Sequence, residues 1–142
     1  MSLSCSKSDE GKGINSYLIF GHSYGECRGD LCIEIFKLTN SQLFEDVNDN
    51  FFTGNVKYEL LSDEKYKIAF DLFNSYPKEL ENETNKSFGC PDCRDQGAII
   101  LQYFNGKDAL QRFVIDQDKN EIPVYLHQYV DSINDKIRLL NR

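Results

Sequence analysis

The sequence predicts an α+β fold, a mainly antiparallel sheet of about five to six strands with two packed helices. Three observations favour this class. Short apolar runs separated by turn residues fill the first part of the chain, as in antiparallel sheets. Asn105-Gly106 joins two longer apolar runs, which is the pattern of a tight hairpin. The final segment carries its apolar residues at helical spacing.

Short strands are expected in the first half of the chain. The apolar run within Asn15 to Tyr24 predicts the first strand, and Leu31 to Thr39, apolar on both faces, predicts the second. Gln42 to Glu45 follows a turn and is expected to pair with the second strand as a hairpin. Asp46 to Asn50 is a polar loop, and Asn55 to Leu61 is a further strand.

A helix is expected between Ser62 and Pro77. The Ser62 hydroxyl can cap its first turn, and Pro77 ends it. The apolar residues between them recur at helical spacing, namely Tyr66, Ala69, Phe70 and Phe73. This face would cover the sheet, whereas the charged segment Lys78 to Ser87 without periodicity is expected to form a loop.

A hairpin and a second helix complete the predicted fold. Gly97 to Phe104 and Ala109 to Asp116 are strands on either side of Asn105-Gly106. The last helix starts near Pro123, a residue favoured in first turns. Its apolar stripe comprises Leu126, Tyr129, Val130, Ile133, Ile137 and Leu140. A stripe of this kind predicts an amphipathic helix docked on the sheet.

Composition limits the function classes. The chain has 142 residues, the length of one domain, and its 40% hydrophobic and 13% aromatic content suffices for a core. Its 23 acidic and 16 basic side chains give a formal net charge of −7, which argues against a nucleic-acid partner because phosphate neutralisation needs a basic face. No run reaches the roughly 18 apolar residues of a membrane span.

Five cysteines are the most informative residues, with four in two close pairs, Cys27 with Cys32 and Cys90 with Cys93, and Cys5 alone. Structural disulfides are the favoured interpretation, and the connectivity stays open because four cysteines allow three pairings. Zinc held by the four thiolates is the alternative. A redox motif is a weaker one, since a strand rather than a helix follows Cys93 and no helix dipole would lower a thiol pKa.

The amino terminus resembles the end of a bacterial lipoprotein signal. Ser4 precedes Cys5, and a polar stretch rich in Ser and Gly follows. Cys5 would then carry the lipid, and Met1 to Leu3 are expected to derive from cloning. We therefore expect residues 1–14 to form a tether and residues 15–142 to form one globular α+β domain. An ordinary flexible terminus with a chance cysteine is the alternative.

Two short motifs have chemical counterparts. The segment from Gly21 to Gly25 matches the nucleophile elbow G-x-S-x-G around Ser23, but too few residues precede it for a hydrolase sheet, and the following residues form a turn. A small serine hydrolase with His127 as base is accordingly the least favoured alternative. The segment from Arg28 to Asp30 resembles the adhesive RGD loops of disintegrins, although Gly-Asp is also ordinary turn chemistry.

Two segments begin like calcium loops. Asp46 to Asn50 and Asp116 to Asn120 place oxygen-bearing side chains at alternate positions. Both lack the glycine required at the sixth position, where Phe51 and Glu121 stand instead. We interpret both segments as solvated turns.

The combined motifs resemble those of small uncharacterised lipoproteins of Bacteroidetes. The resemblance is carried by Ser4-Cys5, Tyr24 to Leu38, Cys90 to Gly97 and Pro123 to His127. It implies a cell-envelope location, periplasmic or surface-facing, and reducible cross-links; no activity comes with it.

The sequence predicts an exported, lipid-anchored domain that is not an enzyme and needs no cofactor, with zinc as the alternative. It would contact the membrane through its lipid alone and bind an unidentified protein or glycan. The expected binding surface is the loop Glu26 to Leu31 beside the segment Pro91 to Gln96, provided that the cysteine pairs hold both on one face. Its candidate residues are Arg28, Asp30, Asp92 and Arg94.

Overall fold

A computed structural model describes residues 15–29, 31–107 and 109–142, and in this part of the chain seven strands form one sheet. The strands are β1 (Tyr17–Ser23), β2 (Ile33–Leu38), β3 (Leu43–Asp46), β4 (Tyr58–Leu60), β5 (Ser87–Phe88), β6 (Ala98–Phe104) and β7 (Leu110–Asp116). Their order across the sheet is β4-β3-β2-β1-β6-β7-β5, and all neighbours are antiparallel except β5 and β7. The predicted α+β class is confirmed, with one strand more than the expected range.

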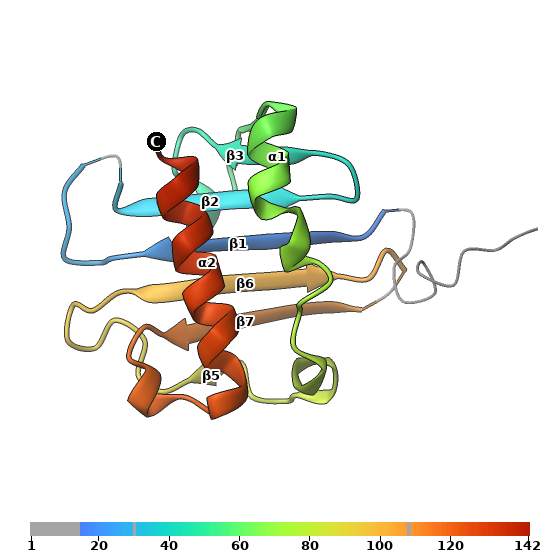
Figure 1. Ribbon diagram of the computed structural model, residues 1–142. Helices are drawn as coiled ribbons and strands as arrows, with labels where there is room; N and C mark the ends of the chain where they lie inside the picture. Colours follow the sequence, from blue (N-terminus) through green and yellow to red (C-terminus); the bar gives the residue numbers. More distant parts are fainter. Residues whose placement is uncertain (1–14, 30, 108) are drawn as a thin grey trace, which may run out of the picture.

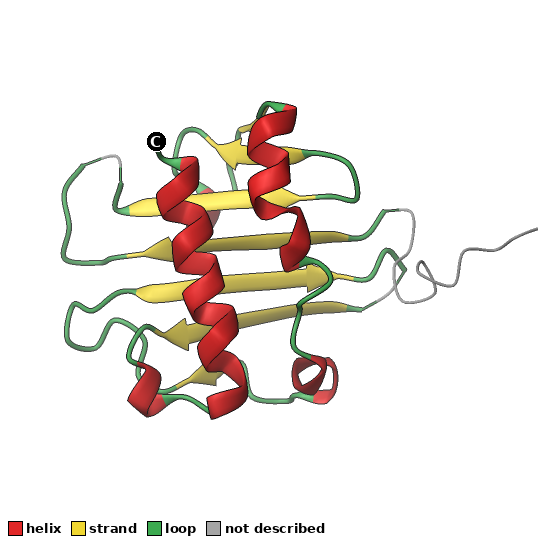
Figure 2. Ribbon diagram, viewed as in Figure 1, coloured by secondary structure: helices red, strands yellow, loops and turns green. Residues whose placement is uncertain are grey.

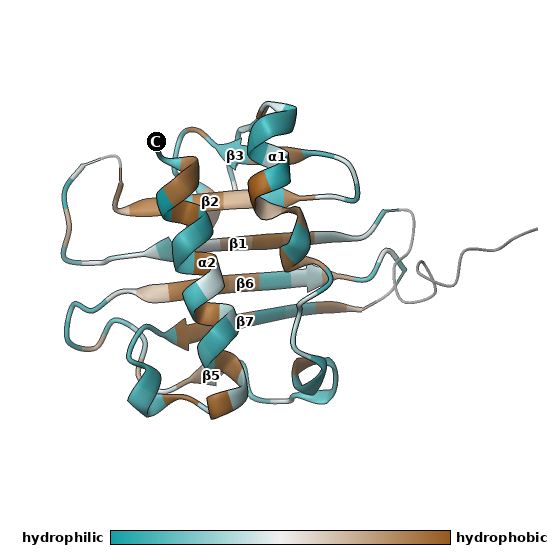
Figure 3. Ribbon diagram, viewed as in Figure 1, coloured by the Kyte–Doolittle hydropathy of each residue, from teal (hydrophilic) through white to brown (hydrophobic). Residues whose placement is uncertain are grey.

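The centre of the sheet is β1, which pairs with β2 on one side and with β6 on the other. Phe20 lies opposite Phe36 and Leu101, and all three side chains point to the face that the helices cover. Alternation along each strand turns the next residues to the opposite face. Figure 3 shows the apolar colour concentrated in these central strands, whereas the loops at both ends of the sheet are mostly polar.

Two α-helices cover one face of the sheet (Figures 1 and 2). α1 (Asp63–Ala69) begins as predicted, because the Ser62 hydroxyl accepts a hydrogen bond from the Lys65 N–H at 3.3 Å. α2 (His127–Leu140) crosses the strands in Figure 1 and buries every residue of its predicted stripe. The Tyr129 hydroxyl donates to the Leu72 carbonyl at 2.8 Å, which ties α2 to the segment after α1.

Short 3-10 helices fill several connections. They are η2 (Phe51–Thr53), η3 (Phe70–Leu72), η4 (Lys78–Asn82), η5 (Lys119–Glu121) and η6 (Val124–Leu126). η2 has a packing role, since Phe51 joins a second, smaller buried cluster with Ile19, Ile35 and Ile100 on the face that lacks the α-helices. The connection between β3 and β4 therefore covers part of this second face.

The segment from Lys78 to Ser87 differs from the prediction of an unstructured loop. It contains η4, where Leu80 is fully buried, and it leads into β5, which pairs with Val114 and Ile115 of β7. A two-residue strand carries no periodic pattern, so the sequence gives no signal for it.

The directions of the strands bring several loops together. β3 and β7 both run in the direction of β1, because two successive antiparallel pairings connect each of them to β1. All three strands therefore finish at the same end of the sheet, which we call the loop end. Both cysteine motifs lie there, because β2 and β6 begin at this end. In the described residues, no helix has both the length and the apolar character needed to cross a membrane.

Candidate functional site

Each cysteine motif forms its own pair at disulfide distance. Cys27 pairs with Cys32 and Cys90 with Cys93, with 5.6 Å between the Cα atoms in both cases. This separation lies within the range for unstrained disulfide geometry. The connectivity that the sequence left open is thus pairing within each motif. Cys27, Cys90 and Cys93 are exposed, whereas Cys32 is buried at the start of β2.

Asp92 joins the two cysteine loops. Its carboxylate accepts a hydrogen bond from the Gly25 N–H at 2.8 Å and another from the Gly97 N–H at 2.9 Å. Gly97 also packs against the Tyr24 ring so closely that a side chain at this position would overlap it. The loop after β1 and the loop before β6 consequently share contacts, as expected for one surface. We call these two loops, residues 24–32 and 89–97, the cysteine-loop surface.

The backbone of the second loop is unusual around Asp92. Asp92 and Asp95 have φ angles of 60° and 61°, and Gly89 and Gly97 flank them with φ of 70° and 86°. Left-handed backbone is sterically costly for residues with a Cβ atom, although aspartate tolerates it better than most. The Asp92 conformation persists because its carboxylate is fixed by donors from both loops.

A buried carboxylate supports the second loop from below. Asp116, the last residue of β7, is 1% exposed and accepts hydrogen bonds from the Cys90 N–H at 2.9 Å, the Gln96 amide at 2.9 Å and the Asp118 N–H at 2.8 Å. Burial alone would raise the pKa of Asp116, but these donors and the nearby Arg94 charge outweigh burial and lower it. The loop therefore has a carboxylate brace that is independent of its sulfur atoms.

The charged residues predicted for the surface have different surroundings. Arg94 reaches out of the second loop and pairs with Asp118 at 2.9 Å, and its side chain remains largely exposed. Arg28 is exposed in the first loop. Asp92 is partly buried between the two loops and acts as their link. Asp30 lies outside the described residues, and so does the predicted lipid anchor Cys5.

Ser23 is placed away from the helical layer that carries the proposed base. It is the last residue of β1, and the strand alternation turns it to the face of Ile19 and Ile35. His127 begins α2 on the other face, where its Nε2 atom contacts the Ile122 carbonyl at 3.2 Å. Within the described residues, no hydrogen bond joins Ser23 to a histidine, and a loop rather than a helix follows Ser23.

In residues 15–29, 31–107 and 109–142, no three His, Cys, Asp or Glu side chains are arranged to hold a metal ion. The four sulfur atoms stand as two pairs.

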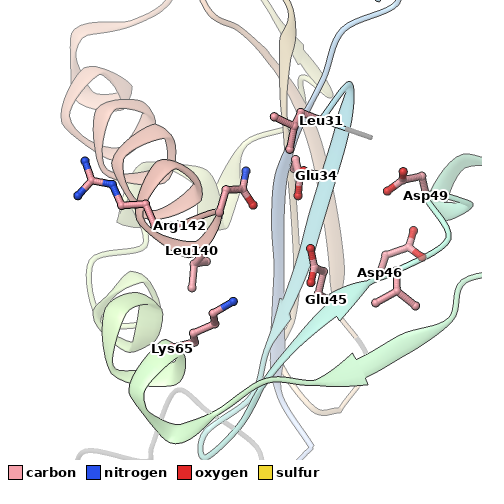
Figure 4. Close-up of a pocket in the computed structure, with 10 residues that line it drawn as sticks. Leu31, Glu34, Glu45, Asp46, Asp49, Lys65, Leu140 and Arg142 are labelled. Atoms are coloured by element: carbon pink, nitrogen blue, oxygen red, sulfur yellow. The ribbon is translucent and has the colours of Figure 1, made fainter. Parts of the chain in front are cut away.

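An acidic pocket that no sequence pattern predicted lies at the loop end of the sheet (Figure 4). The pocket has a volume of about 530 Å³. It is lined by Leu31, Glu34, Glu45, Asp46, Val47, Asp49, Lys65, Leu140, Asn141 and Arg142. Leu31 belongs to the first cysteine loop, so the pocket borders the cysteine-loop surface.

The interpretation of the two calcium-like segments as solvated turns is wrong for their first residues. Asp46 is 2% exposed and Asp116 is 1% exposed, because each is the last residue of a strand and still belongs to the sheet. The remaining residues of both segments are more accessible. A signal was present in the sequence, since Asp46 directly follows the predicted strand Gln42 to Glu45 and Asp116 is the last residue of the predicted strand Ala109 to Asp116.

Comparison of the chain with known protein families, with curated proteins and with solved structures finds no significant match. The functional interpretation therefore depends on the geometry of the loop end.

Proposed function

We propose that this chain is an exported, non-enzymatic binding domain whose partner, a protein or a glycan, docks on the cysteine-loop surface. The supporting observation is the hydrogen bond that the Gly25 N–H donates to the Asp92 carboxylate. It joins the two loops although these residues are 67 positions apart in the sequence. Loops that are fixed on a rigid sheet are where binding residues commonly lie. Both loops are fixed here, one by Asp92 and the other also by Asp116.

The cysteine pairs support an oxidising location. Disulfides persist in secreted and periplasmic proteins and are rare where cellular thiols keep cysteines reduced. Both pairs close short loops at the proposed surface, so they restrict the conformations that Arg28 and its neighbours can adopt before a partner binds. Preorganisation of this kind reduces the entropy that binding costs.

The lipid anchor belongs to the same proposal. A small residue before Cys5 and the polar stretch after it support attachment of the tether to the cell envelope, with the folded domain projecting from it. Metabolic labelling of the full-length gene product with a fatty-acid analogue should give a labelled protein, and Cys5→Ala should abolish the label. Label that persists in Cys5→Ala would remove the anchor from the proposal.

Site-specific photo-cross-linking in the native host tests the binding surface. A photoreactive residue is introduced at Arg28 or at Arg94, one in each loop, and at Asp135 on the exposed side of α2 as the matched control. We expect cross-linked adducts of the same mass from the two loop positions and none from Asp135. Adducts that form from Asp135 alone, or equally from all three positions, would contradict the proposed surface.

A further inference from the structure

The acidic pocket opens where two strands separate. β3 pairs with β2 from Phe36 to Leu38, and in the described sheet this pairing does not extend to the first residues of β2. The chain leaves β3 at Asp46 and turns through Asp49, whose φ of 54° redirects it. The pocket lies in the resulting gap, closed on the helical side by Lys65 of α1 and by the end of α2 at Leu140.

Asp46 is the unusual residue of this pocket. Its side chain is almost completely buried, and neither carboxylate oxygen has a hydrogen-bond partner among the described residues. A buried carboxylate without donors is strongly unfavourable, and nearly all such groups in proteins are paired or hydrogen-bonded. In Figure 4 the Asp46 carboxylate is turned toward that of Asp49. A positive group from outside the chain would satisfy it.

The surroundings of Asp46 have an excess of negative charge. The pocket is lined by four acidic and two basic side chains. Burial raises the pKa of Glu45, and the charges of Asp49, Glu59 and Asp46 raise it further, although Lys65 acts in the opposite direction. In Figure 4, Lys65 lies on the helical side near Glu45, while Asp46 and Asp49 lie on the other side of β2. The Asp46 side of the pocket is thus the side that a cation would complete.

We propose that this pocket binds a primary alkylammonium group, with Asp46 and Asp49, which lie on the same side of the pocket in Figure 4, as the carboxylates that receive its N–H donors. The ammonium group carries three donors, which matches a wall of carboxylate oxygens. The volume of about 530 Å³ is that of a small-molecule site rather than of a single ion. Leu31, Val47 and Leu140 provide apolar walls for the methylene chain attached to the ammonium group.

A metal ion fits this pocket less well. A divalent cation needs several oxygen ligands at fixed distances, and in the described part of the chain no three acidic, histidine or cysteine side chains converge in that way. An alkylammonium group accepts a looser arrangement of carboxylates. Two sources share its chemistry, a free polyamine and the lysine side chain of a peptide. The site would operate whether or not the cysteine-loop surface has a partner.

Calorimetric titration of the full chain at constant ionic strength tests the proposal. The probes are spermidine, the peptide acetyl-Gly-Lys-Gly-amide, and calcium chloride, with sodium chloride at matched ionic strength as the blank. The variants are Asp46→Asn and Asp49→Asn, which keep the side-chain shape, and Asp135→Asn, which removes one exposed carboxylate that does not line the pocket. Circular dichroism confirms folding, and Asp49→Asn decides the outcome if Asp46→Asn does not fold.

We expect saturable binding of spermidine or of the lysine peptide to the wild-type chain. Asp46→Asn and Asp49→Asn should weaken it by roughly tenfold or more, as for the loss of a charged hydrogen bond, while Asp135→Asn leaves it unchanged. The amine that binds with the higher affinity identifies the source of the ammonium group, a free polyamine or the lysine side chain of a peptide. Absence of saturable binding by either amine, unchanged affinity in both pocket variants, or saturation by calcium alone would overturn the assignment.

Discussion

Asp46 and Asp116 have the same position in the fold and opposite surroundings. Each is the last residue of a strand, at the loop end of one sheet, and each is almost fully buried. Asp116 receives hydrogen bonds from the Cys90 N–H, the Gln96 amide and the Asp118 N–H. Asp46 receives none from the described residues. The comparison separates a carboxylate whose charge the fold satisfies from one whose charge these residues leave without a donor.

The physical difference between the two carboxylates lies in the hydrogen-bond donors that replace their hydration shells on folding. A buried charge is strongly disfavoured unless donors replace its hydration shell. The donors of Asp116 come from the second cysteine loop and the turn after β7, so satisfying the charge also fixes that loop. Asp46 lies where β2 and β3 separate, beyond the last residue pair between them, and neither of its carboxylate oxygens has a donor among the described residues. The first arrangement produces rigidity and the second produces a pocket.

Removing the Asp116 carboxylate should have the largest effect on stability. Asp116→Ala removes the acceptor of three hydrogen bonds, and we expect the free energy of unfolding to fall by about 3 kcal/mol. Urea unfolding at neutral pH measures it, with the exposed Asp135→Asn as a control that should change it by less than about 0.5 kcal/mol. A loss as small as that of the control would show that the donors of Asp116 do not brace the loop.

Opening the second cysteine pair should cost less than removing Asp116. Cys90→Ser with Cys93→Ser removes a cross-link over a very short loop, which loop-entropy considerations value at about 2 kcal/mol. The loop should keep its position, because Asp92 and Asp116 still hold its backbone. Urea unfolding gives the stability, and unchanged amide chemical shifts of the first cysteine loop would report the retained position. Loss of those shifts would assign the bracing to sulfur.

Asp46 should respond in the opposite direction. Asp46→Asn removes a buried charge that has no donors, so we expect the free energy of unfolding to rise by about 1 kcal/mol in the absence of any amine. The same urea experiment measures it. A destabilisation comparable to that of Asp116→Ala would mean that Asp46 has partners in solution, and the contrast between the two aspartates would then be wrong.

The pH dependence of stability should also distinguish the two regions, and this is the smallest of the expected effects. The lowered pKa of Asp116 means that its stabilising contribution is present at neutral pH and is lost as the pH falls through the folded-state pKa. Glu45 in the pocket has a raised pKa, so its contribution is present in acid and is lost as the pH rises through that value. Thermal unfolding measured between about pH 3 and 7 should therefore show two contributions to the pH dependence of stability, with slopes of opposite sign. Asp116→Asn should remove one of them and Glu45→Gln the other. Slopes of the same sign would contradict the assigned environments.

Local sequence patterns predicted most of the fold because they reflect the main source of its stability. The alternation in β1 and β2, the Asn105-Gly106 hairpin and the apolar stripe of α2 all follow from burial of one face. β5 was missed because two residues carry no period, and its pairing depends on the edge that β7 offers.

The candidate site could be predicted only in part. The cysteine spacing identified both loops, but the contact between Asp92 and Gly25 depends on the strand order, which no local pattern contains. Asp46 and Asp116 begin similar polar segments, and their opposite surroundings result from whether the neighbouring strand separates or a loop folds back. Tertiary packing alone distinguishes them.

Hydrogen exchange of the Gly25 amide tests the central claim, that the two cysteine loops form one surface. Its acceptor is the Asp92 carboxylate in the other loop, so protection of this amide reports directly on the junction. Asp92→Gly removes the carboxylate and accepts the left-handed backbone, and Asp95→Gly makes the same change at φ 61° without touching Gly25. We expect a protected Gly25 amide in the wild type and in Asp95→Gly, and rapid exchange in Asp92→Gly. Exchange of the wild-type amide at the rate of an unstructured peptide would contradict the claim.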